Sequence, residues 1–136
     1  MEGSALKVLF VCFGNAYRSP LAEALLKKLR PDLEVDSAGL HVAIPISSRV
    51  REYLRKQNAV QYLKSYPESI SDKNLRDYDV IVTMDQHVRD AVLRKCPACL
   101  DTIVEWKIRD PYFNEKDAEN IFNEIRSKIV EFAGSI

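Results

Sequence analysis

Short apolar runs rich in β-branched residues recur along the chain, separated by longer segments with helical periodicity. The clearest runs are 6–11 (LKVLFV) and 78–84 (YDVIVTM), and both predict buried strands. Two weaker runs, 33–37 (LEVDS) and 102–104 (TIV), predict two further strands. The chain is therefore expected to contribute four strands to its core.

The segments between these strands place apolar side chains at the three- and four-residue spacing of amphipathic helices. In the first helix, Ser19 is expected as the N-cap, Pro20 as the first helical residue and Pro31 as the stop. A second helix is expected over 46–57, and Asp85 is expected to cap a third. The strongest pattern predicts a fourth helix over 117–133, with an apolar face made of Ala118, Ile121, Phe122, Ile125, Ile129 and Ala133.

Strands and helices alternate, which predicts an α/β fold: a parallel sheet with helices on both faces, in three α/β/α layers. No repeat, low-complexity tract or linker interrupts the pattern, so residues 1–136 are expected to form a single domain. Such sheets bind ligands at the carboxyl ends of their strands. The segment 12–19, directly after the first strand, is therefore where chemistry is expected.

Charge and hydropathy disfavour several classes of function. The chain has 20 Lys and Arg against 20 Asp and Glu, and this zero net charge argues against nucleic-acid binding through bulk positive charge. No apolar run approaches the roughly 18 residues of a membrane span. The first seven residues lack the pattern of a secretory signal. We therefore expect a cytoplasmic protein that binds neither membrane nor nucleic acid.

Glycine is scarce, with four residues in the whole chain, of which Gly3 and Gly134 lie near the ends. The other two, Gly14 and Gly39, each follow a predicted strand. Each is expected to mark a close approach of two backbone segments or a positive φ.

The three cysteines, an odd number, are expected to be free thiols in a reducing cytoplasm. Cys96 and Cys99 form a CxxC motif, which is compatible with a redox pair, part of a zinc site or two ordinary thiols. Zinc needs about four ligands, and beyond this pair the sequence offers Cys12, His41 and His87. Ordinary thiols are the favoured interpretation, and no metal or other cofactor is expected.

The segment from Cys12 to Pro20 (CFGNAYRSP) joins the first strand directly to a predicted helix. The free N–H groups and the positive dipole end of a helix N-terminus bind anions, and Arg18 adds a planar fork for two phosphate oxygens. Groups that bind a phosphate dianion also stabilise the thiolate of Cys12, which is a strong nucleophile. This combination suits phosphoryl transfer to sulfur through a cysteinyl-phosphate.

The stretch VLFVCFGNAYRSPLAEALL resembles the signature of the low-molecular-weight protein tyrosine phosphatases, a family that also includes thioredoxin-coupled arsenate reductases. Three further segments resemble the family's second strand and turn (35–39, VDSAG), the end of its third strand (82–85, VTMD) and its general-acid loop (110–112, DPY). The resemblance runs from about residue 7 to residue 133. It implies a four-stranded parallel sheet in the order 2-1-3-4.

The same resemblance implies a role for each matched residue. Cys12 is the nucleophile, Arg18 clamps the phosphoryl oxygens, and Asp110 protonates the leaving oxygen and then activates water. The loop is held by hydrogen bonds from three supporting residues, Asn15, Ser19 and Ser37. The phosphate is bound by the backbone N–H groups of Phe13, Gly14, Asn15, Ala16, Tyr17 and Arg18. The implied substrate is a protein carrying phosphotyrosine, and the implied reaction uses no metal or cofactor.

Two positions depart from the family pattern. Tyr17 stands where many members have a second cysteine, and Ala16 replaces a branched aliphatic residue, which leaves the strictness for phosphotyrosine open. Two other functions also remain open: a thioredoxin-coupled arsenate reductase, and a binding module for anions or phosphoproteins without turnover.

The reductase differs from the phosphatase by requiring a relay of thiols. The helix expected over 86–95 would be about 15 Å long and would carry Cys96 and Cys99 away from Cys12. Because a disulfide needs Cα atoms within about 7 Å, we expect no disulfide between Cys12 and either partner.

Overall fold

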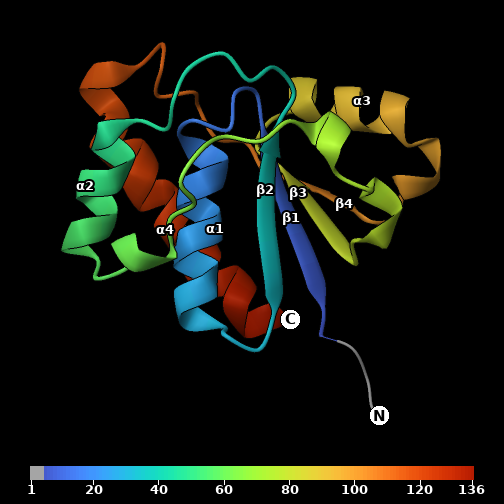
Figure 1. Cartoon of the computed structure of the whole chain (residues 1–136), viewed down its shortest axis with the longest axis horizontal. Helices are drawn as coiled ribbons and strands as arrows, with labels where there is room; N and C mark the ends of the chain where they lie inside the picture. Colours follow the sequence, from blue (N-terminus) through green and yellow to red (C-terminus); the bar gives the residue numbers. More distant parts are fainter. Residues whose placement is uncertain (1–4) are drawn as a thin grey trace.

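A parallel sheet of four strands runs through the middle of the molecule (Figure 1). The structure is a computed structural model, and it describes residues 5–136. The order of the strands is β2-β1-β3-β4, which confirms the expected topology. The strands are β1 (Lys7–Cys12), β2 (Glu34–Gly39), β3 (Val80–Thr83) and β4 (Ile103–Glu105).

Helices cover both faces of this sheet, so the three-layer α/β/α arrangement is confirmed. Helices α1, α2 and α4 pack on one face, and α3 packs on the other (Figure 1). Their bounds are Arg18–Leu29 for α1, Ser48–Lys56 for α2, Gln86–Lys95 for α3 and Ala118–Ser135 for α4.

Alternate side chains of β1 divide the core into two clusters. Phe10 points to the face covered by α1 and α4, where it packs with Trp106 and Phe132 at ring-centroid distances of 5.8 and 6.1 Å. Leu9 and Val11 point to the other face, against the apolar side of α3. Burial on both faces explains why β1 is a continuous apolar run rather than an alternating one.

This topology fixes where a ligand can bind. The chain leaves β1 for its neighbour β2 on one side and then crosses to β3 on the other. The loops after β1 and β3 therefore diverge at the carboxyl ends of two adjacent strands, which is the switch point where open α/β sheets hold ligands. In Figure 1 these ends lie at the top of the sheet.

The expected helix starts are confirmed in one case and corrected in another. Asp85 caps α3, since its Oδ1 accepts a hydrogen bond of 2.9 Å from the N–H of Val88. Helix α1, however, begins at Arg18 with Tyr17 as the N-cap residue and no side-chain cap. The expectation that Ser19 is the N-cap is wrong, because its hydroxyl lies 2.8 Å from the sulfur of Cys12.

The two interior glycines have different roles. A Cβ at Gly39 would lie 2.7 Å from the backbone nitrogen of Asn15, so the expected close approach is confirmed there. A Cβ at Gly14 would meet its nearest neighbour, the carbonyl oxygen of His41, at an ordinary 3.7 Å. No glycine has a positive φ among the described residues; in this loop Asn15 has it, with φ 53°.

The expectation of three free thiols is wrong for two of them. Cys96 and Cys99, at the end of α3, are joined by a disulfide with a Cα–Cα distance of 5.4 Å, while Cys12 is free. Both paired cysteines are buried in the cluster under α3, whereas Cys12 belongs to the cluster on the opposite face of the sheet.

Residues 5–136 contain neither a membrane-spanning helix nor a cluster of metal-binding side chains. No helix there combines the length and apolar character needed to cross a membrane. Within the same range, no three His, Cys, Asp or Glu side chains gather closely enough to hold a metal ion.

Candidate active site

Buried polar side chains are concentrated at one place in the molecule, the loop between β1 and α1 and its surroundings. The buried polar residues of the described chain are Asn15, Arg18, Ser19, Glu23, Ser37 and Thr83. Buried polar groups are costly unless they are hydrogen-bonded. Such a concentration therefore indicates a binding or catalytic site rather than ordinary core packing.

The sulfur of Cys12 lies at the centre of this loop. Its Sγ is 2.8 Å from Ser19 Oγ and 3.2 Å from the backbone nitrogen of Asn15, which donates to it. The first turn of α1 follows directly, so the positive end of the helix dipole also faces this region. The sulfur is therefore surrounded by polar groups that can donate hydrogen bonds.

The side chain of Asn15 connects the loop to neighbouring segments through hydrogen bonds. Its left-handed backbone turns the chain, a conformation that Asn tolerates better than most residues. Its side-chain Nδ2 donates to Ser19 Oγ at 2.8 Å and to Ser37 Oγ at 2.9 Å. The backbone N–H of Glu68 donates to its Oδ1 at 2.8 Å. The loop is thereby tied to β2 and to the segment before β3.

The guanidinium of Arg18 is held from two sides. Nη1 donates to Asp85 Oδ2 at 2.9 Å and to the carbonyl oxygen of Ile108 at 2.8 Å. Nη2 lies 3.7 Å from Asp110 Oδ2. The Arg18 side chain is 3% exposed, so these contacts fix the orientation of the fork at the base of the site.

Asp110 lies on the loop between β4 and α4, at the rim of the same site. Its Oδ1 accepts a hydrogen bond of 3.0 Å from the N–H of Tyr112, and Asn114 Nδ2 donates to its backbone carbonyl at 2.8 Å. A quarter of its side-chain surface is exposed. The carboxyl group is therefore positioned by its own turn and still open to solvent.

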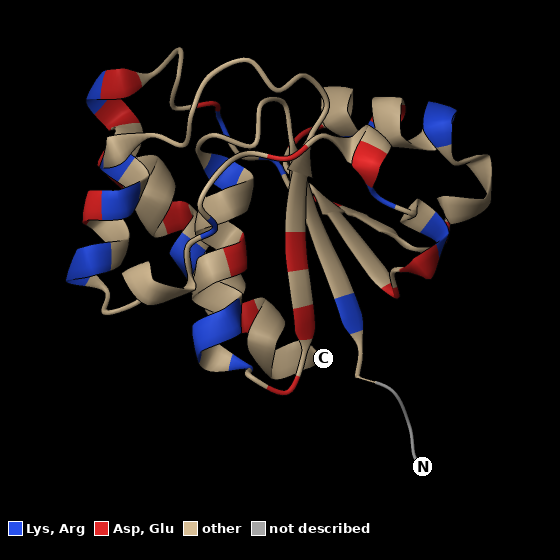
Figure 2. Ribbon diagram, in the orientation of Figure 1, with Lys and Arg blue, Asp and Glu red and all other residues tan. Residues whose placement is uncertain are grey.

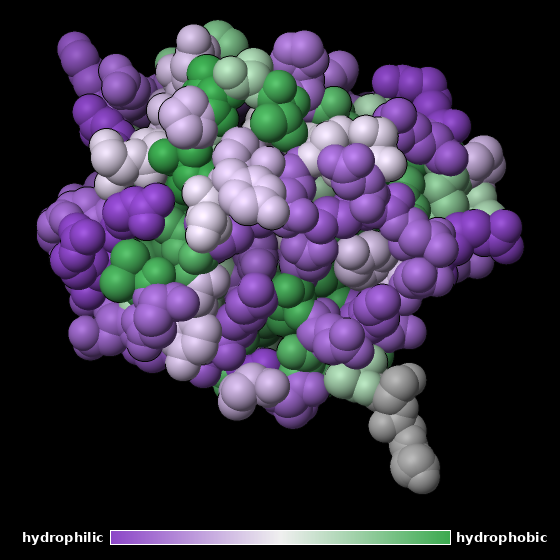
Figure 3. Space-filling view, viewed as in Figure 1, coloured by the Kyte–Doolittle hydropathy of each residue, from purple (hydrophilic) through white to green (hydrophobic). Residues whose placement is uncertain are grey.

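These residues surround a pocket of about 210 Å³. Its walls are mostly apolar, and Figure 3 shows hydrophobic surface along the upper edge of the molecule, over the loops that follow the strands. The lining residues are Cys12, Phe13, Gly14, Ala16, Tyr17, Arg18, His41, Ala43, Ile44, Asp110, Tyr112 and Phe113. The base suits an anion, and the walls suit a flat apolar group above it.

The structure brings together every site residue expected from the sequence. The loop residues from Cys12 to Arg18, together with Asp110, line the pocket, except Asn15. Asn15, Ser19 and Ser37 lie buried behind the loop.

Asp85 was missed as a site residue, because the sequence indicated only its role as a helix cap. A signal did exist: it follows β3 closely at the carboxyl end, so it faces the same edge of the sheet as Cys12.

The CxxC motif lies outside this site. Cys96 and Cys99 are paired with each other on the far face of the sheet from Cys12. The expected separation from Cys12 is thereby confirmed, and the thiol relay of an arsenate reductase is not favoured.

Comparisons with known proteins agree with this arrangement. The family model "Low molecular weight phosphotyrosine protein phosphatase" matches residues 7–135. The low molecular weight protein-tyrosine-phosphatase Wzb of Salmonella typhi is 32% identical over 124 residues, which cover 82% of this chain and 80% of the relative.

Solved structures show the same similarity. YfkJ from Bacillus subtilis has a TM-score of 0.88 at 26% identity, covering 100% of this chain and 97% of its own. Vibrio vulnificus Wzb in complex with benzylphosphonate has a TM-score of 0.84 at 25% identity, covering 98% and 100%. The chain therefore belongs to the family of low molecular weight phosphotyrosine protein phosphatases, which are cysteine-dependent enzymes.

Proposed function

We propose that this chain hydrolyses phosphotyrosine in proteins in two steps, with Cys12, Arg18 and Asp110 as the catalytic residues. The observation that carries the proposal is that a buried thiol and a buried, fixed guanidinium share the base of one pocket, with a carboxyl group at its rim. Nucleophile, anion clamp and proton donor therefore all reach one bound phosphoryl group.

In the first step the thiolate of Cys12 attacks phosphorus, and the bond from phosphorus to the tyrosine oxygen breaks. Asp110 gives its proton to that oxygen, so that tyrosine leaves as a neutral phenol. Arg18 and the loop N–H groups stabilise the charge on the three remaining phosphoryl oxygens. The product of this step is a cysteinyl-phosphate and an ionised Asp110.

In the second step water attacks the same phosphorus atom and the S–P bond breaks. Asp110 now accepts a proton from the water, and the thiolate of Cys12 is regenerated as phosphate leaves. Ser19 and the N–H of Asn15, both within hydrogen-bond distance of the sulfur, stabilise the leaving thiolate. The same contacts that favour the nucleophile thus also favour its release.

The walls of the pocket support an aryl phosphate as substrate. Phe13, Tyr112 and Phe113 provide exposed aromatic surface around the opening, where a phenyl ring can pack. The related Wzb of Vibrio vulnificus was solved with benzylphosphonate, an aromatic phosphonate. Ala16 and Tyr17 line the same pocket, and these are the positions that depart from the family pattern.

The proposed partner is a phosphoprotein rather than a nucleic acid. Positive and negative residues are interspersed over the helices (Figure 2), and the net charge of zero does not favour binding to the phosphate backbone of a nucleic acid. The proposed compartment is the cytoplasm, and residues 1–136 are proposed to act as one phosphatase domain.

The nucleophile is tested by Cys12→Ser. We expect no turnover of p-nitrophenyl phosphate, because a serine hydroxyl is not ionised at neutral pH. Vanadate binding, measured by calorimetry, should largely survive, since the loop N–H groups and Arg18 remain. Appreciable hydrolysis by this variant would show that Cys12 is not the nucleophile.

The general acid is tested by Asp110→Ala across a series of leaving groups. The rate should fall by about 10²–10⁴-fold for phenyl phosphate and much less for p-nitrophenyl phosphate, whose leaving group needs little protonation. The alkaline limb of the wild-type pH profile should also flatten in the variant. Equal losses for the two substrates would assign the acid role to another residue.

A further inference from the structure

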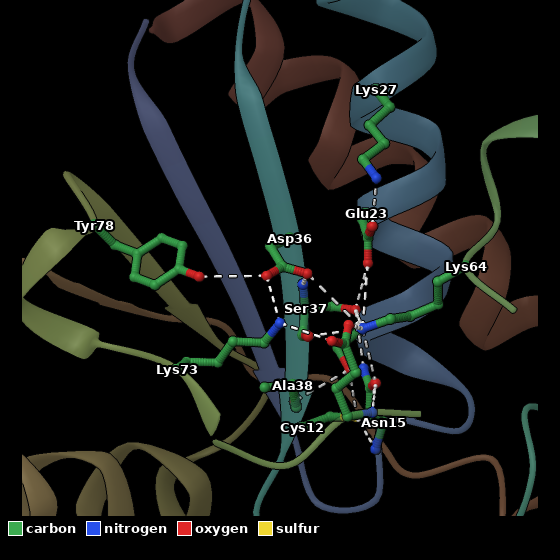
Figure 4. Close-up of polar contacts among 12 residues, drawn as sticks. Cys12, Asn15, Glu23, Lys27, Asp36, Ser37, Ala38, Lys64, Lys73 and Tyr78 are labelled. Carbon is green, nitrogen blue, oxygen red and sulfur yellow. Dashed lines mark hydrogen bonds and ion pairs between the residues drawn. The ribbon is translucent and has the colours of Figure 1, made fainter. Parts of the chain in front are cut away.

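We propose that Lys64 is a positioning residue that fixes the direction of a hydrogen-bond chain ending at the sulfur of Cys12. This inference rests on the proposed role of Cys12 as the nucleophile. Lys64 lies on the segment between α2 and β3, far from the loop in sequence, and its side chain is 9% exposed. Figure 4 shows its ammonium pointing into the cluster behind Asn15.

The ammonium of Lys64 is surrounded by acceptors. It lies 3.1 Å from Asn15 Oδ1, 2.8 Å from the carbonyl oxygen of Ser37 and 3.2 Å from Ser37 Oγ. Its carboxylate partners are Glu68 at 2.6 Å and Glu23 and Asp36 at 3.8 Å each. A buried charge with this many partners is held firmly in place.

An ammonium group can only donate hydrogen bonds. The atom of the Asn15 amide that faces Lys64 must therefore be the oxygen, and the N–H of Glu68 imposes the same orientation from a second direction. The Nδ2 group is consequently directed to the other side, toward Ser19 and Ser37.

The direction of the next bond follows from this. Ser19 Oγ accepts from Asn15 Nδ2 at 2.8 Å, so its single hydrogen remains to be donated. Two acceptors are within reach: Cys12 Sγ at 2.8 Å and the carbonyl oxygen of Ala38 at 3.5 Å, which is at the limit for a hydrogen bond. The hydroxyl therefore donates to the sulfur and stabilises its thiolate form.

Lys73 provides a matched control within the same cluster. Its ammonium lies 2.6 Å from Asp36 and 3.1 Å from Glu68, and its side chain is 11% exposed. It shares two acidic partners with Lys64 but has no hydrogen bond to Asn15, Ser19 or Ser37. Substitution of either lysine by Met therefore removes a buried positive charge. Only the substitution of Lys64 also removes a contact with the hydrogen-bond chain that ends at Cys12.

The test compares Lys64→Met with Lys73→Met. Cys12 is alkylated with neutral iodoacetamide at a series of pH values, and the modified peptide is quantified by mass spectrometry. We expect the midpoint of the alkylation profile to rise by about 0.4–1 pH unit in Lys64→Met, because one hydrogen bond changes an equilibrium by about 2- to 12-fold. Lys73→Met should shift it by less than half as much, and Lys64→Arg should restore most of the wild-type value.

Phosphate binding should remain within about twofold of wild type in Lys64→Met, since the loop N–H groups and Arg18 are unchanged. Equal alkylation shifts in the Met variants of the two lysines, or no shift in either, would overturn the proposal. If Lys64→Met does not fold, Lys64→Gln against Lys73→Gln gives the same comparison. Alkylation needs no turnover, so a wild-type protein without phosphatase activity would refute the proposed function and leave this result interpretable.

Discussion

Two residues determine the shape of the loop after β1, one in the loop itself and one at the end of β2. Asn15 takes the left-handed conformation, and Gly39, at the end of β2, leaves the space that the backbone of Asn15 occupies. Cys12 is directly opposite Gly39 in the register of β1 and β2. The missing side chain at Gly39 therefore permits the loop to fold down beside the nucleophile.

Gly39→Ala should distort this loop. The added Cβ would lie 2.7 Å from both the nitrogen of Asn15 and the carbonyl carbon of Gly14, and neither backbone atom can move without displacing the loop. We expect a loss of about 1–3 kcal/mol in the free energy of unfolding. We also expect kcat/KM for p-nitrophenyl phosphate to fall by about 10- to 100-fold, because small misplacements of reacting groups are costly.

Gly14→Ala is the control within the same loop. Its Cβ would make only an ordinary contact of 3.7 Å, and its φ is not positive. We expect a stability close to that of wild type, contrary to what the sequence indicated for this glycine. Urea unfolding of both variants measures the difference, and equal losses of stability from the two substitutions would contradict this description of the loop.

At the scale of the elements, periodicity predicted most of what the structure contains. The four strands and four helices lie where apolar spacing placed them, with ends shifted by one to a few residues. The N-cap prediction failed for Ser19. A serine before a proline usually caps a helix, but here the Ser19 hydroxyl contacts the sulfur of Cys12, and the local sequence does not show that contact. The prediction also missed the second function of Asp85, whose other carboxylate oxygen holds Arg18 across 67 positions of sequence.

The end of α3 carries the disulfide, and we expect this element to be independent of catalysis. Reduction of Cys96–Cys99 should lower the free energy of unfolding by about 2 kcal/mol, the value expected for closing so short a loop. Activity should be the same in both redox states, because the pair lies on the far face of the sheet from Cys12. Activity assays and urea unfolding with and without a reductant measure both effects.

Peroxide should inactivate the enzyme through Cys12 alone. No cysteine lies beside it in the loop to form a protecting disulfide, since position 17 is tyrosine, so oxidation should continue to irreversible acids. The double variant Cys96→Ser/Cys99→Ser should lose activity at the wild-type rate. A peptide that links Cys12 to Cys96 or Cys99 in the oxidised protein would instead support the reductase hypothesis.

At the scale of the whole molecule, the features that the sequence did not predict are those that join distant segments. Lys64 meets Asn15 across 49 positions, and the carbonyl of Ile108 meets Arg18 across 90. Local spacing carries no information on such pairs, because they depend on how the strands are ordered. The resemblance to a known family implied catalytic roles for Cys12, Arg18 and Asp110 and supporting roles for Asn15, Ser19 and Ser37. It did not indicate Lys64, which contacts Asn15 and Ser37.

The charged cluster behind Asn15, made of Lys64, Lys73, Asp36 and Glu68, also makes the stability of the fold depend on pH. Burial alone would raise the pKa of Asp36, but hydrogen bonds from Lys73 and from the N–H of Ser37, with the charges of both lysines, lower it overall. Burial alone would also raise the pKa of Glu68, but hydrogen bonds from Lys64 and Lys73 and the charges of these lysines lower it overall. Tyr78, whose hydroxyl donates to Asp36, has its pKa raised to about 12 by burial and by the charge of Asp36.

These shifts set the pH window in which the cluster stabilises the fold. The pKa values of Asp36 and Glu68 are lower in the folded than in the unfolded chain, so their contribution is present above about pH 4 and is lost as the pH falls through the folded values. The raised pKa of Tyr78 acts in the opposite direction. Its contribution is present below about pH 10 and is lost as the pH rises toward 12.

Asp36→Asn tests this window. At pH 7 we expect the variant to lose about 1 kcal/mol in the free energy of unfolding, a modest value because the carboxylate is partly exposed. The difference from wild type should shrink as the pH falls below about 4, since both proteins then lack the charge at this position. Urea unfolding from pH 3 to pH 11 measures it, with Asp101→Asn at an exposed turn as the control. A difference between Asp36→Asn and wild type that stays constant down to pH 3 would show that packing, and not the ionised carboxylate, accounts for the contribution of Asp36.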